Sequence, residues 1–428
     1  MKTLRSSDRN FRYEFEKILK RGEDGAKDVE REVKSILEEV RLRGDKAVQK
    51  FTLSFDQFNV EPNKFAVTKA EIKKAYKEIS KEQLAALQLA AERVKAYHSQ
   101  QKVNEFELNA KGIKVSQRVL PLERVGIYVP GGKASYPSSV LMNVIPARVA
   151  GVKEVIVTTP FVEGKGAPAV LVAADIAGVD NIYKIGGAQA IAAMAYGTNI
   201  IKKVDKIVGP GNAFVVQAKK QVFGLVDIDM MAGPSEILII ADEKAEPAWV
   251  AADLLSQAEH DEAASTVLIT FNSNYAHRVE GEIRRQLRIL PRRKIAEASI
   301  KSRSFIIVAK DLSEAAALSN EIAPEHLELA IQDPEKLLPK IRNAGAIFLG
   351  YHTPEACGDY IAGPSHVLPT AGSARFSSPL GVTAFLKTSS IIHFEAKALQ
   401  DFGKSIICLA ELEGLQAHAQ SVQIRLKN

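Results

Sequence analysis

Four side chains in this sequence are of the types that bind metal ions. Gln257 and His260 are three residues apart at the end of an apolar run, 249–256, and in a helix that spacing places both on one face. Asp359 and His418 follow far downstream. Zn²⁺ readily binds imidazole nitrogen and carboxylate oxygen, whereas the amide oxygen of glutamine is an uncommon ligand. A helical Gln-x-x-His pair alone is typical of a solvated surface, so the prediction of a metal site depends on the combination.

A second group able to do chemistry is the adjacent pair Glu325 and His326. Histidine has an unperturbed pKa of about 6.5, which suits a general base at neutral pH. A carboxylate beside it can orient and deprotonate a water molecule, and a positioned base typically contributes about 10²–10⁴-fold in rate. The alternative is an exposed pair at a helix start after Pro324.

Ordered motifs run along the chain from Arg124 to His418. They occupy residues 126–132, 185–192, 208–213, 232–236, 256–261, 323–327, 358–360 and 366–370. Through these motifs the chain resembles the histidinol dehydrogenase family, zinc- and NAD-dependent enzymes that complete histidine biosynthesis. The resemblance extends from the amino-terminal helices to the last ten residues, which makes it far more specific than any single motif.

The resemblance implies a four-electron oxidation of L-histidinol to L-histidine through L-histidinal, with two NAD⁺ consumed. It implies that His326 takes the alcohol proton and Glu325 activates water. It also implies one Zn²⁺ per subunit, bound by Gln257, His260, Asp359 and His418, and NAD contacts from Tyr128, Gln189 and Asn212. The positions that match substrate contacts are Ser235, His326, Glu413 and the four metal ligands, and His366 is a further candidate for the pocket lining.

Three alternatives remain open at this point. A relative that oxidises another small alcohol, such as sulfopropanediol, would keep the ligands but alter the pocket around Ser235 and Glu413, both present here. A zinc hydrolase would explain the ligands but not the glycine-rich strand ends. Cys357 offers thiolate attack on the aldehyde, although the family pattern does not require it. Two departures from that pattern, Met231 for an expected Pro and Ser365 for an expected Asn, bear only on local loop geometry and pocket shape.

Composition is that of an ordinary globular protein: 428 residues, 46% hydrophobic and 25% charged. Although the net charge is +6, the 57 basic residues are interleaved with 51 acidic ones, which disfavours a nucleic-acid-binding protein. We expect no membrane span and no signal peptide. The two cysteines, Cys357 and Cys408, form no Cys-x-x-Cys pattern, and a reducing cytoplasm is the expected location.

The order of apolar runs predicts an α/β fold with two tandem Rossmann-like parallel-sheet domains. Strand-like runs at 125–129, 154–158, 181–185 and 206–208 alternate with helical runs at 138–150, 167–177, 188–197 and 213–223. A second series has strands at 237–240, 266–270, 305–308, 327–330 and 346–349. Such alternation indicates right-handed βαβ crossovers, with ligands at the carboxyl ends of the strands.

Glycines cluster at those strand ends, at Gly131-Gly132, Gly186-Gly187, and Gly209 with Gly211. No Gly-x-Gly-x-x-Gly fingerprint occurs, and residues 158–160 supply no ribose-binding acid after the second strand. The residues alone therefore predict a nucleotide-type site, and the resemblance supplies NAD.

We expect an amino-terminal arm at 1–22 and an NAD-binding domain at 121–236. The first 110 residues of the chain are predicted to be helical. Residues 23–120 would join residues 237–380 in the domain that carries the metal and catalytic residues. A tail at 381–428 would complete the chain. The resemblance implies a homodimer with swapped tails, in which Glu413 and His418 complete the neighbour's site.

Overall fold

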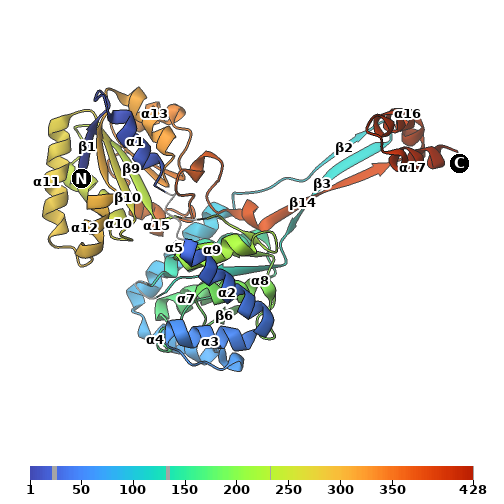
Figure 1. Ribbon diagram of the computed structural model, residues 1–428, viewed down its shortest axis with the longest axis horizontal. Helices are drawn as coiled ribbons and strands as arrows, with labels where there is room; N and C mark the ends of the chain where they lie inside the picture. The colour runs from blue at the N-terminus through green and yellow to red at the C-terminus, as the bar shows by residue number, and fades with distance from the viewer. Residues whose placement is uncertain (22–26, 132–134, 232, 428) are drawn as a thin grey trace.

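Figure 1 shows the computed structural model of the chain, which describes residues 1–21, 27–131, 135–231 and 233–427. Two α/β lobes lie next to each other, and a long thin arm projects from them to a helical tip. Gly132 and Ala232, which belong to the sequence motifs, lie outside the described residues. The prediction of an α/β fold with two parallel sheets is confirmed.

The first lobe is built on a parallel five-stranded sheet with the order β6-β5-β4-β7-β8. Its strands are β4 (Arg124–Tyr128), β5 (Glu154–Thr158), β6 (Asn181–Tyr183), β7 (Lys206–Val208) and β8 (Asp227–Ile228). The crossover helices are α6 (Pro137–Ala150), α7 (Pro168–Ala177), α8 (Gly187–Tyr196) and α9 (Ala213–Val222). The four predicted strands and four predicted helices of this region agree with these elements to within about two residues, and the short β8 was missed.

Four amino-terminal helices cover this same sheet. They are α2 (Lys27–Arg43), α3 (Asp45–Asp56), α4 (Lys69–Glu78) and α5 (Lys81–His98). The apolar faces of α2 and α3 join the core on the α8 and α9 side, while α4 and α5 pack on the α6 and α7 side. This packing corrects the predicted grouping of residues 23–120 with residues 237–380.

The start of α4 shows how local sequence sets an element. The Thr68 side chain accepts a hydrogen bond from the Glu71 amide at 3.2 Å, and the Glu71 carboxylate accepts one from the Thr68 amide at 2.8 Å. This capping box satisfies two amides that the first helical turn leaves without partners.

The second lobe has a parallel six-stranded sheet with the order β1-β11-β10-β9-β12-β13. Its strands are β1 (Lys2–Arg5), β9 (Glu236–Ala241), β10 (Ser265–Thr270), β11 (Phe305–Val308), β12 (His326–Ala330) and β13 (Ala346–Leu349). Helices α1 (Phe11–Leu19), α13 (Leu312–Ile322) and α14 (Pro334–Leu337) cover one face. Helices α10 (Pro247–Ala258), α11 (Ser273–Leu287) and α12 (Arg293–Ser302) cover the other. The predicted amino-terminal arm, 1–22, is thus not separate over its described residues, 1–21, because β1 extends this sheet.

The arm is an antiparallel three-stranded sheet capped by two helices. Strands β2 (Phe106–Ala110), β3 (Ile113–Pro121) and β14 (Leu386–Phe394) pair in the order β14-β3-β2. Helices α16 (Ala396–Leu412) and α17 (Gln416–Leu426) pack on each other at its outer end (Figure 1). The predicted tail, 381–428, supplies three of these five elements, while β2 comes from the end of the region that was predicted to be helical and β3 from just after it.

The remaining elements are short. They are α15 (Glu355–Tyr360) and the 3₁₀ turns η1 (Pro62–Lys64), η2 (Leu338–Lys340), η3 (Ser373–Arg375) and η4 (Val382–Phe385). Within the described ranges, no helix combines the length and apolar character needed to cross a membrane.

Candidate active site

The predicted catalytic pair lies at the beginning of β12, at the edge of the six-stranded sheet where its strands start. Both side chains are buried, and both are held by the main chain of Glu236 on the neighbouring strand β9. The Glu236 amide donates to Glu325 Oε2 at 2.8 Å. His326 Nδ1 lies 2.9 Å from the Glu236 carbonyl oxygen, and because a carbonyl only accepts, Nδ1 carries the hydrogen. The lone pair of a neutral His326 is therefore on Nε2, which has no hydrogen-bond partner among the described residues.

Glu236 is itself fixed by a buried ion pair. Its carboxylate accepts hydrogen bonds from Arg21 at 2.6 and 2.9 Å, and both side chains are 6% exposed. The same carboxylate accepts from the Ala371 amide at 3.0 Å. A two-point bond to a planar guanidinium fixes orientation as well as charge. Arg21, two residues after the end of α1, thus helps to position the side chains of Glu325 and His326 through Glu236.

Burial and charge shift the proton affinities of this pair. Burial raises the pKa of the Glu325 carboxyl to about 8, and the adjacent His326 limits the rise. Burial alone would lower the pKa of His326, but the carboxylates of Glu325, Glu355 and Asp359 outweigh it and raise that pKa to about 10. A buried group in which carboxylates outnumber imidazoles suits a cation.

Three of the four predicted metal ligands lie at this edge. Gln257 is in the last turn of α10 and 1% exposed, and neither its amide oxygen nor its amide nitrogen has a hydrogen-bond partner within the part of the chain described. It lies close enough to Glu355 to help lower the pKa of that carboxyl, although burial raises it overall. His260 follows just after α10, and burial lowers its pKa while Asp359 opposes the shift.

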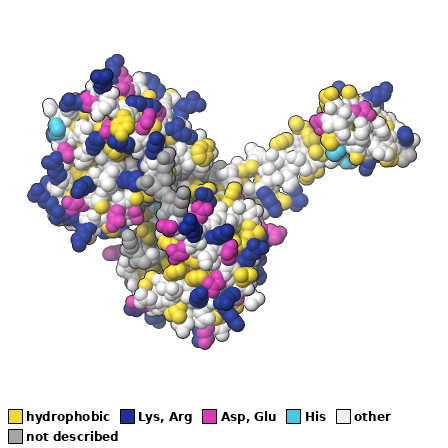
Figure 2. Space-filling view, in the orientation of Figure 1, with side chains coloured by type: hydrophobic (Ala, Val, Ile, Leu, Met, Phe, Trp, Pro, Cys, Tyr) yellow, Lys and Arg dark blue, Asp and Glu magenta, His cyan; other side chains and the backbone are white. Residues whose placement is uncertain are grey.

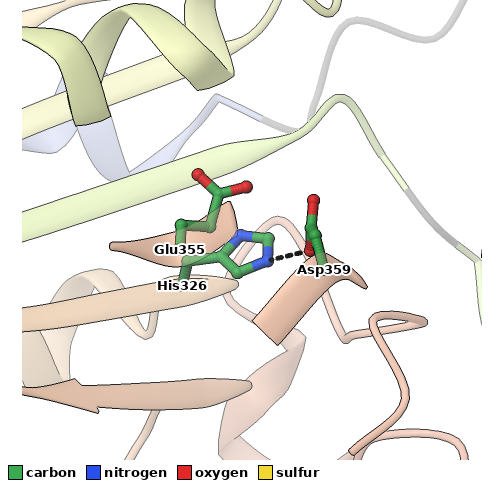
Figure 3. Close-up of side chains that lie close together, drawn as sticks. All are labelled: His326, Glu355 and Asp359. Atoms are coloured by element: carbon green, nitrogen blue, oxygen red, sulfur yellow. Dashed lines mark ion pairs between the residues drawn. The ribbon is translucent and has the colours of Figure 1, made fainter. Parts of the chain in front are cut away.

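Asp359 lies on α15 and connects these residues to His326. Its Oδ1 is 3.7 Å from His326 Nε2, and Figure 3 shows the two side chains facing each other. Although burial acts to raise it, the pKa of Asp359 lies below its ordinary value, mainly because of His326, His366 and His260. One ligand atom each of His326, Glu355 and Asp359 lie within 4.8 Å of one another.

The fourth predicted ligand is elsewhere in the same chain. His418 is exposed on α17, and Glu413, the predicted substrate contact, is exposed at the end of α16. Both helices form the tip of the arm, well away from α10 and α15 in Figure 1. One chain by itself therefore does not bring the four predicted ligands together.

Ser235 and His366 are two further predicted residues next to this site, and His366 connects it to the first lobe. Ser235, a predicted substrate contact, directly precedes β9 and its carbonyl accepts from Ser265 at 3.0 Å. His366 Nδ1 lies 3.1 Å from the Asp359 carbonyl oxygen, and its Nε2 lies 3.3 Å from Ser139 Oγ in the first turn of α6. Ser365, one of the departures from the family pattern, donates to the Met142 carbonyl of α6 at 3.2 Å. The catalytic edge thus meets the amino end of α6.

The predicted NAD residues lie at the carboxyl ends of the strands of the five-stranded sheet, whereas the catalytic pair lies at the amino ends of the strands of the other sheet. Tyr128 is the last residue of β4, and its hydroxyl accepts from the Gly187 amide at 3.1 Å, at the first turn of α8. Gln189, in that same turn, is fully buried with neither amide atom partnered inside the described ranges. Helix amino termini attract anions such as pyrophosphate.

The third NAD residue, Asn212, caps α9. Its Oδ1 accepts from the Phe214 and Val215 amides at 3.1 and 3.2 Å. The loop before it is tied down by a buried ion pair between Lys219 and Asp229. The Gly209 amide donates to Asp229 at 2.7 Å, and the Gly209 carbonyl accepts from Lys219 at 3.0 Å.

Comparison with known proteins gives one consistent result. The family model for histidinol dehydrogenase matches residues 19–426. The chain is 55% identical to histidinol dehydrogenase from Syntrophotalea carbinolica, over 100% of both chains, and 54% identical to that from Geobacter metallireducens, over 100% of this chain and 98% of the relative. The chain belongs to the histidinol dehydrogenase family.

A solved structure agrees with this assignment. The crystal structure of histidinol dehydrogenase from Elizabethkingia anophelis superposes with a TM-score of 0.94, at 39% identity, over 100% of this chain and 98% of that one. The predictions of the family and of a dehydrogenase are therefore confirmed. The roles of individual residues remain predictions.

Sequence reasoning missed two members of the site. Glu355 lies one helical turn before Asp359 on α15, and that spacing, Glu355 to Asp359, was a usable signal. Glu236 ends a motif that was recognised, but no role was assigned to it. Nothing in the sequence shows that its main chain contacts both catalytic residues, because that contact depends on the pairing of β9 with β12.

Proposed function

We propose that this protein oxidises L-histidinol to L-histidine through L-histidinal with two NAD⁺, as the last step of histidine biosynthesis. The observation that carries the proposal is the buried Glu325 and His326 pair, held on one main-chain unit beside Gln257 and Asp359, in a chain that belongs to this family over nearly its whole length.

In the first half-reaction His326 accepts the hydroxyl proton at Nε2. The Glu236 carbonyl fixes the tautomer that leaves this nitrogen free, and Nε2 points toward Asp359, where the alcohol would be bound. The carbon then loses a hydride to NAD⁺, which gives the aldehyde and one NADH. Because carboxylates hold the pKa of His326 high, positive charge at Asp359 would bring it toward the range of a base at neutral pH.

In the second half-reaction Glu325 accepts a proton from water as the water adds to the aldehyde carbon. The hydrated aldehyde, as its anion, loses a second hydride to NAD⁺ and gives the carboxylic acid and a second NADH, and the acid then releases a proton to become the carboxylate. The raised pKa of Glu325, caused mainly by burial, suits a carboxylate that must take up a proton near neutral pH.

The residues at this edge fit a bound Zn²⁺. Gln257 contributes a buried amide without a partner among the described residues, beside the imidazole of His260 and the carboxylate of Asp359. Nitrogen and oxygen ligands of these types suit zinc. Zinc there would act as a Lewis acid that binds and orients the alcohol. We assign one zinc per subunit, with the partner subunit's His418 as the fourth ligand.

A homodimer with a shared active site completes this arrangement. The arm exposes many apolar side chains, visible along it in Figure 2, and they include Phe106, Leu108, Ile391, Ile392, Leu409 and Leu412. An elongated sheet with apolar residues exposed to this extent is unusual for a monomer. A second copy of the chain would cover it and would receive His418 and Glu413 at its own site.

The carboxylate of Glu413 supports histidinol over an anionic, sulfonated diol such as sulfopropanediol. A carboxylate delivered to the site would bind the ammonium or imidazole group of the substrate. The two cysteines are both free thiols, which fits the cytoplasm, the location that we propose with this pathway.

The assay is NADH formation by the purified, zinc-loaded protein with histidinol, and with sulfopropanediol in parallel. We expect two NADH per histidinol consumed and histidine as the product. Turnover of sulfopropanediol without turnover of histidinol would assign the protein to the family relatives that oxidise other alcohols.

A further inference from the structure

The first lobe has the strand order of a dinucleotide-binding fold but lacks one of its usual residues. If its strands β4, β5, β6, β7 and β8 are numbered 1 to 5 along the chain, their order across the sheet is 3-2-1-4-5. In such folds an acidic residue near the end of the second strand binds the ribose hydroxyls of NAD. Here β5 ends in Thr158, and Thr159 and Pro160 follow, so that strand supplies no carboxylate.

Another segment brings a carboxylate to the same place. Asp56 is the last residue of α3, and its carbonyl accepts from the Glu163 amide at 2.9 Å, in the loop after β5. Two residues later, the Phe58 ring stacks on Phe161 of that loop, with centroids 6.5 Å apart. These contacts fix the end of α3 against the carboxyl end of the second strand.

The Asp56 carboxylate lies near Tyr128, at the carboxyl end of β4. Its Oδ2 is buried and has no hydrogen-bond partner among the residues that the structure describes. Burial raises the pKa of the Tyr128 hydroxyl to about 12, and the negative charge of Asp56 adds to this rise. Burial also raises the pKa of Asp56 itself, to about 6. A carboxylate held in this state is destabilising unless a ligand donates to it.

We propose that Asp56 binds the adenosine ribose of NAD⁺ by accepting a hydrogen bond from its 2′-hydroxyl, and that it thereby sets the preference for NAD⁺ over NADP⁺. The inference rests on the proposed NAD⁺-dependent function and names a residue for it. With the pyrophosphate at the amino terminus of α8, the adenosine ribose would extend toward β5, where Asp56 lies. A 2′-phosphate would meet the same carboxylate and be repelled.

The test compares NAD⁺, NADP⁺ and NAD⁺ that lacks the 2′-hydroxyl on the adenosine ribose. Dissociation constants are measured by calorimetry on the zinc-loaded dimer. In the unsubstituted protein we expect the deoxy analogue to bind about 10- to 100-fold more weakly than NAD⁺, the effect of losing a hydrogen bond to a charged group. In Asp56→Asn we expect the two to bind within about twofold to fivefold, and the NAD⁺ to NADP⁺ ratio to fall at least about tenfold.

Asp45→Asn is the matched control. Asp45 begins the same helix, is buried, and also has one carboxylate oxygen without a partner in the described chain. Its other oxygen accepts from the Asn199 amide at 3.1 Å, beyond the end of α8 and thus away from the nucleotide edge. Asp45→Asn should leave the NAD⁺ to NADP⁺ ratio unchanged, whatever it does to stability.

Equal binding of NAD⁺ and its deoxy analogue by the unsubstituted protein would overturn the proposal, and this measurement requires no variant to fold. An unchanged NAD⁺ to NADP⁺ ratio in folded Asp56→Asn would also overturn it. Either result, obtained with a protein that forms NADH from histidinol, leaves the proposed function in place. Failure of the unsubstituted protein to bind NAD⁺ would instead contradict the proposed function.

Discussion

Apart from the edge strand β1, the two sheets of this protein share a strand order, but their predicted functional residues lie at opposite ends of the strands. In the five-stranded sheet, β4 and β7 occupy the centre, and Tyr128 and Gly209 lie where these strands end. In the six-stranded sheet, β9 and β12 occupy the equivalent centre, and Glu236 and His326 lie where these strands begin.

The difference follows from what each end must hold. Strand ends that lead into helix amino termini offer amides and close backbone approach, which suit phosphates. The other end collects side chains from the start of β12, from the last turn of α10 and from α15, so polar and ionisable groups converge there: Glu325, His326, Gln257, Glu355 and Asp359. In our proposal the same topology therefore serves nucleotide binding at one end and proton transfer at the other, so the topology alone does not determine which end is used.

The largest expected effect concerns the catalytic end. Glu325→Gln keeps an oxygen that can accept from the Glu236 amide, so the fold should survive. Because it removes the base for water, we expect conversion of histidinal to histidine to slow by about 10²–10⁴-fold. Oxidation of histidinol to histidinal should slow much less. Single-turnover assays from each substrate check this, and equal losses in both would remove Glu325 from its assigned role.

A smaller effect is expected at the nucleotide end. A Cβ on Gly209 would lie 2.1 Å from the Tyr128 carbonyl oxygen, and the residue has a φ of +113°. Gly209→Ala should therefore displace the loop before Asn212, raise the KM for NAD⁺ at least about tenfold, and change kcat little.

Gly224→Ala is the comparison for Gly209→Ala. Gly224 has a φ of +96° but no atom within 4 Å of its Cβ position. It should lose about 1–2 kcal/mol of stability through backbone strain alone, with an unchanged KM for NAD⁺. Equal KM values for NAD⁺ in the two variants would show that the Gly209 loop does not take part in cofactor binding.

The smallest effect concerns Asp56 and pH. Burial raises its pKa in the folded protein to about 6, above its value of about 3.9 in an unfolded chain. The folded state thus binds the proton more tightly, so this residue makes stability fall as the pH rises from about 4 to 6. Without NAD⁺, Asp56→Asn should raise the melting temperature by a few degrees at pH 7 and not at pH 4. A lower melting temperature at pH 7 would contradict the assigned cause.

Sequence reasoning worked where burial alone decides the structure of a segment. Apolar runs identified the central strands of both sheets, because these strands are buried on both sides whatever surrounds them. It failed for β2, β3 and β14, since none of these strands is buried in a core and they are defined by their pairing with each other. It also placed α2 to α5 against the wrong sheet, because an amphipathic stripe shows which face is buried but not by what.

The candidate site divides in the same way. Gln257, His260 and Asp359 were found from residue type and spacing together with the family resemblance, and the structure brings them to one edge. Glu236 and Asp56 were not found, because their importance arises from tertiary contacts. Glu236 acts through its main chain, and Asp56 comes from a helix distant in sequence from the strand that it complements.

The central claim is that the catalytic end of the six-stranded sheet is completed by another subunit's arm. The most direct test mixes two inactive variants, His260→Ala and His418→Ala, under conditions in which subunits exchange. In a hybrid dimer one of the two sites regains all four ligands, so activity should return to about half that of the unsubstituted dimer per hybrid. If exchange is demonstrated and no activity returns, each arm serves its own chain and the shared site is wrong.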